Sequence, residues 1–279
     1  IFGFSMVMLW DQWQVYNGNK ATFFPSPAKT AGSTAAPASA VTGLPTAITT
    51  TTAAAGTATM AQTVGTSAGA PAAAVASRER IEVTTDVLKL TFDTQGGTII
   101  RSEFLKHADL NDTQKATVLL DESRDRVYVA QTGLIGGAFP NHKTPMSFSG
   151  ERVLKDGANE LVLKFQSPDL GGVRLIETYT LSRGSYAVRV KHEVVNTGTA
   201  PVSPQLYLQL VRDGNKPPGE SSFYSTFTGP AVYTEAKKYQ KIEFKDIESG
   251  KVDIPKDSAN GYVAMVQHYF ATAWLLADG

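Results

Sequence analysis

The 279 residues contain no cysteine, which excludes a disulfide framework, a thiolate metal site and a thiol nucleophile within this sequence. There is also no excess of charge, because 26 basic residues balance 26 acidic ones. A balanced charge argues against general electrostatic attraction to nucleic acid, and we predict no nucleic-acid partner. The four histidines are scattered without metal-ligand spacing, so we expect no metal site: His107, His142, His192 and His268.

The usual catalytic and cofactor-binding signatures are missing as well. The sequence has no HExxH or Walker A motif and no GxGxxG after a strand, and its one GxSxG match, Gly65 to Gly69, lies in an uncharged stretch and not at a turn from a strand to a helix. The glycine pairs Gly96-Gly97 and Gly136-Gly137 are interpreted as turns and not as phosphate-binding loops. We therefore expect neither a cofactor nor an enzyme.

A long stretch near the N-terminus lacks charge altogether. Residues 30–77 contain no charged side chain and consist almost entirely of Ala, Thr, Gly, Ser and Pro. Such a composition cannot bury enough apolar surface to offset the loss of conformational entropy. We predict that residues 18–78 form a disordered linker and that compact structure begins near Arg80.

The sequence opens on an apolar run, IFGFSMVML, which stops at Trp10-Asp11. A membrane span needs about 20 apolar residues, so we interpret residues 1–17 as the C-terminal part of a transmembrane helix whose beginning is missing. Trp10, Trp13 and Tyr16 would form its interfacial aromatic belt. The alternative is a remnant of a signal peptide, but the run lacks a basic start and a clear cleavage site.

The strongest structural signal is a hairpin over residues 173–198. Its first arm places Val173, Leu175, Tyr179 and Leu181 on one face, with the period of two of a half-buried strand. The second arm repeats the pattern, and Arg183-Gly184 is predicted to be a two-residue turn. An antiparallel ribbon with one apolar face needs a second apolar layer, which favours an all-β, sheet-on-sheet domain.

Short strands separated by Gly, Pro, Asn and Asp clusters are predicted along the rest of the domain. Helical turns are expected only at Leu105–Asn111 and Thr234–Tyr239. Residues 262–276 are predicted to be one long, nearly continuous apolar strand. The other expected strands are Ile81–Thr85, Leu88–Phe92, Thr98–Phe104, Thr117–Leu120, Val127–Thr132, Met146–Leu154, Glu160–Gln166, Gln205–Val211, Phe223–Phe227, Ala231–Thr234 and Lys241–Phe244.

Two polar residues, Glu177 and His192, interrupt the apolar face of the hairpin. With a two-residue turn, Glu177 would lie opposite Val190 and diagonal to His192, roughly 7–8 Å away. A glutamate and a histidine at this distance are the sequence's only candidates for paired acid–base catalysis. The competing interpretation, which we favour, is a hydrogen-bonded polar pair at the margin of a sheet.

Several short motifs, taken in order, resemble the bacterial inner-membrane insertases of the YidC family. Trp10-Asp11-Gln12-Trp13-Gln14 resembles the end of that family's first transmembrane helix. The matches continue at Leu88–Phe92 with Gly96-Gly97, at Arg183–Val188 with Asn196 and Gly198, and at Val263–Met265 with Gln267 and Tyr269–Trp274. The matches follow one another in the family's order, after an anchor and a linker, and this order is fairly specific.

The resemblance implies a periplasmic β-supersandwich domain, similar to galactose mutarotases, over residues 79–279. It implies that this domain is truncated at its C-terminus and that the insertase groove lies outside this chain. It also implies an inner-membrane protein that helps to insert and fold membrane proteins. Its partners would be the Sec translocon's accessory subunits SecD and SecF, nascent membrane proteins, and the lipid bilayer through the anchor.

A second hypothesis remains open from the sequence. A supersandwich could be a carbohydrate-active enzyme, such as an aldose epimerase that opens a sugar ring with a histidine acid and a carboxylate base. Glu177 and His192 would be its catalytic pair. An anchored structural or adhesion domain is the weakest alternative.

Overall fold

The computed structural model of the protein describes residues 43–48, 78–217 and 226–276. The chain divides into two units, residues 1–43 and 44–279, and all the elements named below belong to the second. The predicted anchor and most of the predicted linker lie outside the described residues. Within the described ranges, no helix is both long enough and apolar enough to cross a membrane.

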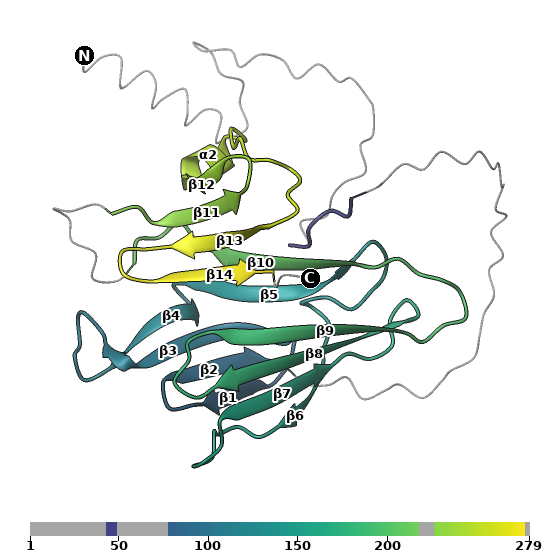
Figure 1. The fold of residues 1–279 in the computed structure, drawn as a ribbon, viewed down its shortest axis with the longest axis horizontal. Coiled ribbons are helices and arrows are strands. Elements are labelled where there is room, and N and C mark those ends of the chain that lie inside the picture. The colour runs from purple at the N-terminus through teal and green to yellow at the C-terminus, as the bar shows by residue number, and fades with distance from the viewer. Residues whose placement is uncertain (1–42, 49–77, 218–225, 277–279) are drawn as a thin grey trace, which may run out of the picture. The chain divides into compact units, whose positions relative to one another are not determined.

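The described part is mostly β-strand, arranged in three antiparallel sheets (Figure 1). In the six-stranded sheet the order is β1-β2-β3-β4-β5-β10, and its strands are β1 (Arg80–Thr84), β2 (Leu88–Asp93), β3 (Thr98–Ala108), β4 (Ala116–Glu122), β5 (Val127–Ile135) and β10 (Gln205–Arg212). A four-stranded sheet follows the order β6-β7-β8-β9, with β6 (Ser147–Gly150), β7 (Glu160–Gln166), β8 (Val173–Ser182) and β9 (Val188–Asn196). The C-terminal sheet follows the order β12-β11-β13-β14, with β11 (Gly229–Thr234), β12 (Lys238–Lys241), β13 (Gly261–Val266) and β14 (Ala271–Leu275).

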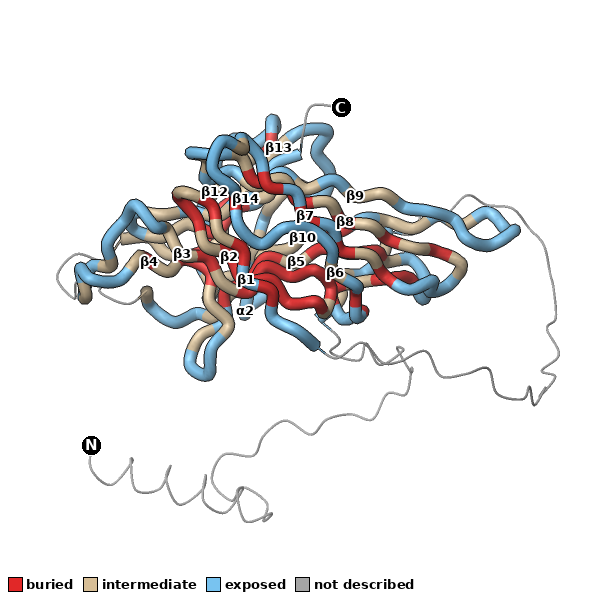
Figure 2. The backbone as a smooth tube through the Cα atoms, turned by 90° about the horizontal axis from the view of Figure 1, so that it is seen from below, coloured by how far each residue is buried: buried red, intermediate tan, exposed pale blue. Residues whose placement is uncertain are grey.

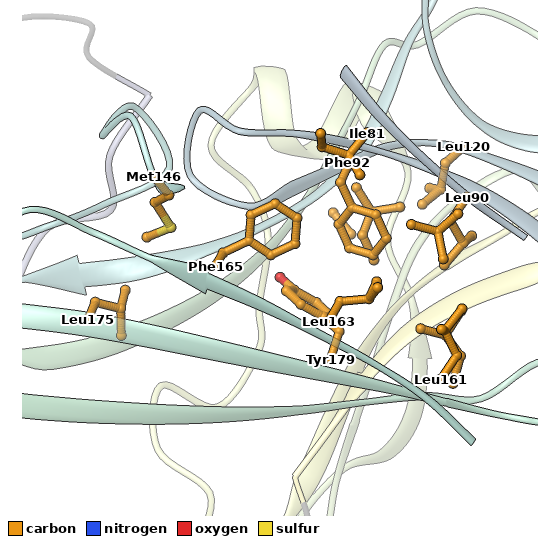
Figure 3. Packing of buried hydrophobic residues seen from close by; sticks show 14 of the residues in the cluster. Ile81, Leu90, Phe92, Leu120, Met146, Leu161, Leu163, Phe165, Leu175 and Tyr179 are labelled. Atoms are coloured by element: carbon orange, nitrogen blue, oxygen red, sulfur yellow. The ribbon is translucent and has the colours of Figure 1, made fainter. Parts of the chain in front are cut away.

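The first two sheets share one hydrophobic core. Along β8 buried and half-buried residues alternate without interruption, as the sequence pattern predicts, and β7 buries Leu161, Leu163 and Phe165. Phe92 of β2 meets Phe165 at 5.3 Å and Tyr179 at 5.0 Å between ring centroids (Figure 3). The predicted packing of sheet on sheet is confirmed for these two sheets, and Figure 2 shows their strands carrying most of the buried residues.

The C-terminal sheet contacts the six-stranded sheet through polar groups. Tyr128 of β5 donates a hydrogen bond to the Thr272 hydroxyl at 2.8 Å, and the Trp274 indole N–H donates to the Gln209 carbonyl at 3.0 Å. Met265 of β13 also belongs to the main core. The two hydrogen bonds join β14 to β5 and β10 of the six-stranded sheet.

Both helical predictions are wrong. Residues 105–108 continue β3, because Ala108 pairs with Ala116 of β4 and the Thr117 hydroxyl donates to the Ala108 carbonyl at 2.8 Å. The Thr234–Tyr239 segment is the hairpin turn between β11 and β12. A short helix, α2 (Phe244–Glu248), follows instead, so the strand predicted at Lys241–Phe244 is also wrong.

The predicted continuous strand at residues 262–276 is wrong too. It is a hairpin in which β13 and β14 pair antiparallel, from Tyr262 opposite Leu275 to Val266 opposite Ala271. The backbone N–H of Gln267 donates a hydrogen bond to the Phe270 carbonyl at 2.9 Å and closes the turn. The polar Gln267-His268 step marks this turn, because backbone groups leaving a sheet need polar surroundings or local partners.

The other predicted strands are present with shifted ends, except that β6 is shorter than expected. The strand predicted at Phe223–Phe227 falls mostly outside the described residues.

Candidate functional site

The register of β8 and β9 brings Glu177 and His192 directly opposite each other. This corrects the predicted diagonal arrangement, which rested on a two-residue turn. The connection is longer, because Leu181 pairs with Val188 and the residues between them form a wider loop. Since directly opposed residues of an antiparallel pair lie on the same face, both side chains belong to the inner face of the sheet.

Glu177 is buried without any exposed surface, in contact with the turn between β2 and β3. Its Oε2 lies 3.2 Å from the Tyr179 hydroxyl. Its Oε1 is buried and has no hydrogen-bond partner among the described residues. The carboxyl group fits here only because Gly97 has no side chain, since a Cβ at that position would lie 2.5 Å from Oε2.

The Tyr179 hydroxyl lies within hydrogen-bond distance of two acceptors, the Glu177 Oε2 and the Gly97 carbonyl, and this bears on the protonation of Glu177. The Tyr179 hydroxyl has one proton and lies 3.1 Å from the Gly97 carbonyl, which can only accept. If Tyr179 donates to that carbonyl, the bond to Glu177 requires a proton on the carboxyl group. Burial supports the same state, because it raises the pKa of Glu177 to about 8, whereas the Tyr179 hydroxyl opposes this shift.

His192 makes its bond to a different partner. Its Nε2 lies 2.9 Å from the Thr132 hydroxyl of β5, and that hydroxyl donates to the Tyr207 carbonyl at 3.0 Å. Because Thr132 has one proton, Nε2 carries the hydrogen of its bond to Thr132. Burial lowers the pKa of His192 to about 4, so the imidazole is neutral at neutral pH.

A second histidine, His142, is hydrogen-bonded to Tyr207 next to the His192–Thr132 contact, and the sequence did not predict this contact. The Tyr207 hydroxyl accepts a bond from the His142 backbone N–H at 3.0 Å and lies 2.5 Å from its Nδ1. Burial together with Lys143 lowers the pKa of His142, which favours a neutral imidazole whose Nδ1 can accept the phenol proton. Gly133 permits this contact, since a Cβ there would lie 2.8 Å from the Tyr207 hydroxyl.

The sequence carries a weak signal for the contact between His142 and Tyr207. The glycine at position 133 interrupts an apolar strand, which indicates a close approach of another chain segment. It does not indicate which segment approaches. Only the fold brings together residues that are 60 or more positions apart in the sequence. Examples are His192 with Thr132 and His142 with Tyr207.

These groups form a buried polar cluster in which Glu177 and His192 have different hydrogen-bond partners. Glu177 bonds to Tyr179 and His192 bonds to Thr132, and both side chains are uncharged at neutral pH. Proton transfer to a substrate requires a group within hydrogen-bond reach of it, and Glu177 is wholly enclosed. In the described ranges, no three His, Asp or Glu side chains are grouped in a way that could hold a metal ion.

A groove of about 460 Å³ lies near β4 and the β13–β14 turn. Charged groups line one part of it, including the ion pair between Arg101 and Asp121 at 2.6 Å. Leu110 and Tyr269 line another part and are 64% and 66% exposed. The groove thus combines accessible apolar side chains with paired charges.

Comparison with known proteins places the domain in a family. Residues 80–279 match the family model of the YidC periplasmic domain. The chain is 46% identical over 284 residues to the membrane protein insertase YidC of Bordetella parapertussis, and 47% identical over 283 residues to that of Bordetella avium. Each comparison covers the whole chain and 49% of the relative.

A more distant relative, the membrane protein insertase YidC of Janthinobacterium, is 43% identical over 99% of the chain and 48% of its own length. The chain therefore spans about half the length of the curated relatives it matches. This is a family of insertases and not of enzymes, which confirms the expectation of a non-enzymatic domain. The chain belongs to the YidC membrane protein insertase family, and residues 80–279 form its YidC periplasmic domain.

Proposed function

We propose that this chain is the anchored periplasmic part of an inner-membrane insertase that helps membrane proteins to insert and fold. The observation that carries this proposal is the match of residues 80–279 to the YidC periplasmic domain, together with relatives named membrane protein insertase. Residues 1–17 would supply the anchor in the bacterial inner membrane, and residues 18–78 would link it to the domain. The substrates would be nascent membrane proteins.

We infer a β-supersandwich of the galactose mutarotase type for the periplasmic domain. The face-to-face packing of the six-stranded sheet on the β6–β9 sheet supports this inference. The same fold in an enzyme would need accessible catalytic groups, whereas Glu177 is enclosed and shares no hydrogen bond with His192. The buried cluster therefore has a structural role, and the domain acts through its outer surface.

The groove beside the β13–β14 turn is the surface we propose for docking SecD and SecF, the accessory subunits of the Sec translocon. Protein interfaces are enriched in aromatic residues and arginine, and the groove exposes Tyr269 beside Arg101. Its exposed Leu110 offers a second apolar contact. A partner that covered these two side chains would bury apolar surface that is now in contact with water.

The test is co-purification from native membranes of the affinity-tagged full-length protein. We expect SecD and SecF to co-purify with the wild type and to be reduced at least tenfold by the double substitution Leu110→Asp and Tyr269→Asp. The matched control is Val162→Asp, because Val162 is 50% exposed on β7 in another sheet. Equal recovery from all three proteins would refute docking at this groove.

The broader function is tested separately by depletion of the native insertase and complementation. The full-length protein should restore insertion of a substrate membrane protein into inner-membrane vesicles. Failure to do so, with the protein correctly located and folded, would refute the proposed insertase role even if SecD and SecF still co-purified.

A further inference from the structure

One short segment of the predicted linker contacts the domain. The Ile48 backbone N–H donates to the side-chain oxygen of Gln205 at 2.9 Å, and the Gln205 side-chain nitrogen donates to the Ile48 carbonyl at 2.7 Å. Gln205 is the first residue of β10, and Figure 1 shows residues 44–48 beside this strand. The composition of the linker gave no indication of such a contact.

The contact is made by the backbone of the segment. Both bonds from Gln205 go to the main chain of Ile48, while the Ile48 side chain is 69% exposed. Leu44, Pro45 and Ala47 are half-buried. A side-chain amide that bonds to both the N–H and the C=O of one residue reproduces the pairing of a β-ladder, so it recognises extended backbone and not a particular side chain.

We propose that Gln205, at the start of β10, is a docking site for residues 44–48 of the same chain. The occupant is thus a segment of the linker itself, bound in cis. Docking closes the 29 residues 49–77 into a covalent loop between Ile48 and the start of the domain at Arg78. This inference concerns a different surface from the groove proposed for SecD and SecF.

Because residues 44–48 are covalently linked to the domain, even a weak site is enough to hold them. Two solvent-accessible hydrogen bonds would hold a free peptide poorly, because water competes for the same groups. A linked segment, however, is presented at an effective concentration in the millimolar range, so that a site with a dissociation constant of about 1 mM is substantially occupied. The docking is accordingly reversible.

The consequence is a change in how far the domain can reach from the membrane, and this part rests on the proposed anchor at residues 1–17. Between the anchor and the first residue fixed to the domain lie 26 residues (18–43) when the segment is docked and 60 (18–77) when it is not. At about 3.5 Å per extended residue, the greatest separation is about 90 Å in the docked state and about 210 Å in the free state.

The experiment measures distances between two nitroxide labels in the 279-residue chain by pulsed electron paramagnetic resonance. The labels are attached at Thr46→Cys and Val162→Cys, both exposed, and the sequence has no native cysteine. We expect a narrow distance distribution in the parent protein and a distribution at least twice as broad after Gln205→Ala. Gln114→Ala, which removes an exposed glutamine in the β3–β4 loop, is the control and should change nothing.

Two substitutions at position 48 separate backbone recognition from side-chain recognition. Ile48→Ala keeps both backbone groups and should retain the narrow distribution, whereas Ile48→Pro removes the donated N–H and should broaden it. A broad distribution in the parent protein would overturn the proposal. So would a narrow one in both the parent and Gln205→Ala, because the segment would then be held without Gln205. Broadening by Ile48→Ala equal to that by Ile48→Pro would show that the side chain is recognised instead.

Discussion

The enclosed carboxyl group of Glu177 should make the stability of the domain depend on pH. Burial raises the pKa of Glu177 to about 8 in the folded protein, from the ordinary value of 4.5. The folded state therefore holds this proton over a pH range in which the unfolded chain has released it. The stability that the group provides is fully present below about pH 4.5 and is lost as the pH rises toward 8.

The substitution Glu177→Gln should remove this loss. A glutamine amide can form the hydrogen bond with the Tyr179 hydroxyl in place of the protonated acid, but it has no proton to release. With about 1.4 kcal/mol for each unit of pKa difference, the gain in the free energy of unfolding should be near zero at pH 4.5. It should reach about 3 kcal/mol at pH 7 and about 5 kcal/mol above pH 8.

Urea unfolding of the wild type and the variant at pH 4.5, 7 and 8.5 measures this difference. The control is Glu248→Gln, which removes a carboxylate that is exposed at the end of α2. A gain that did not change with pH would mean that Glu177 is ionised in the folded protein. A loss of stability at every pH would mean that the carboxyl group makes a bond that glutamine cannot replace. Either result would refute the reasoning.

Two further substitutions test the contacts around the buried cluster by the same unfolding measurement. Gly97→Ala should destabilise the domain by about 2–4 kcal/mol, because the added Cβ would meet Glu177 and the φ of Gly97 is +58°. The control is Gly184→Ala, which should cost only about 1 kcal/mol, because Gly184 also has a positive φ, +71°, but has open space around it. Equal losses of stability from the two substitutions would contradict the proposed clash. Tyr207→Phe should cost about 1–3 kcal/mol by leaving two buried groups of His142 without their partner. Tyr239→Phe, on an exposed tyrosine, should be neutral, and a neutral Tyr207→Phe would show that water replaces the phenol.

Local sequence patterns were sufficient for much of the fold. The alternation in residues 173–181 predicts a half-buried strand, and β8 has that pattern over its whole length. The same alternation led to the expectation of a second apolar layer, and Phe92 of β2, in the six-stranded sheet, packs from that layer against Phe165 and Tyr179. These predictions succeeded because the period of side chains along a strand is fixed by the backbone and is independent of which strands become neighbours.

Patterns of the same kind failed where the chain turns. Residues 262–276 are apolar on both sides of a polar step, and composition alone does not distinguish a long strand from a hairpin of two short ones. Likewise, the register of β8 and β9 depends on the length of their loop, and two residues more or fewer change which residue faces Glu177.

The sequence by itself determined an all-β domain and a pair of polar residues, Glu177 and His192, on the apolar face of one hairpin. Only the tertiary structure decided what those residues do. It encloses Glu177 against Gly97 and beside Tyr179, and it pairs His192 with Thr132, so Glu177 and His192 have different hydrogen-bond partners. The physical reason is that burial and hydrogen-bond partners come from strands distant in the sequence, and these set both the protonation state and the accessibility of each group.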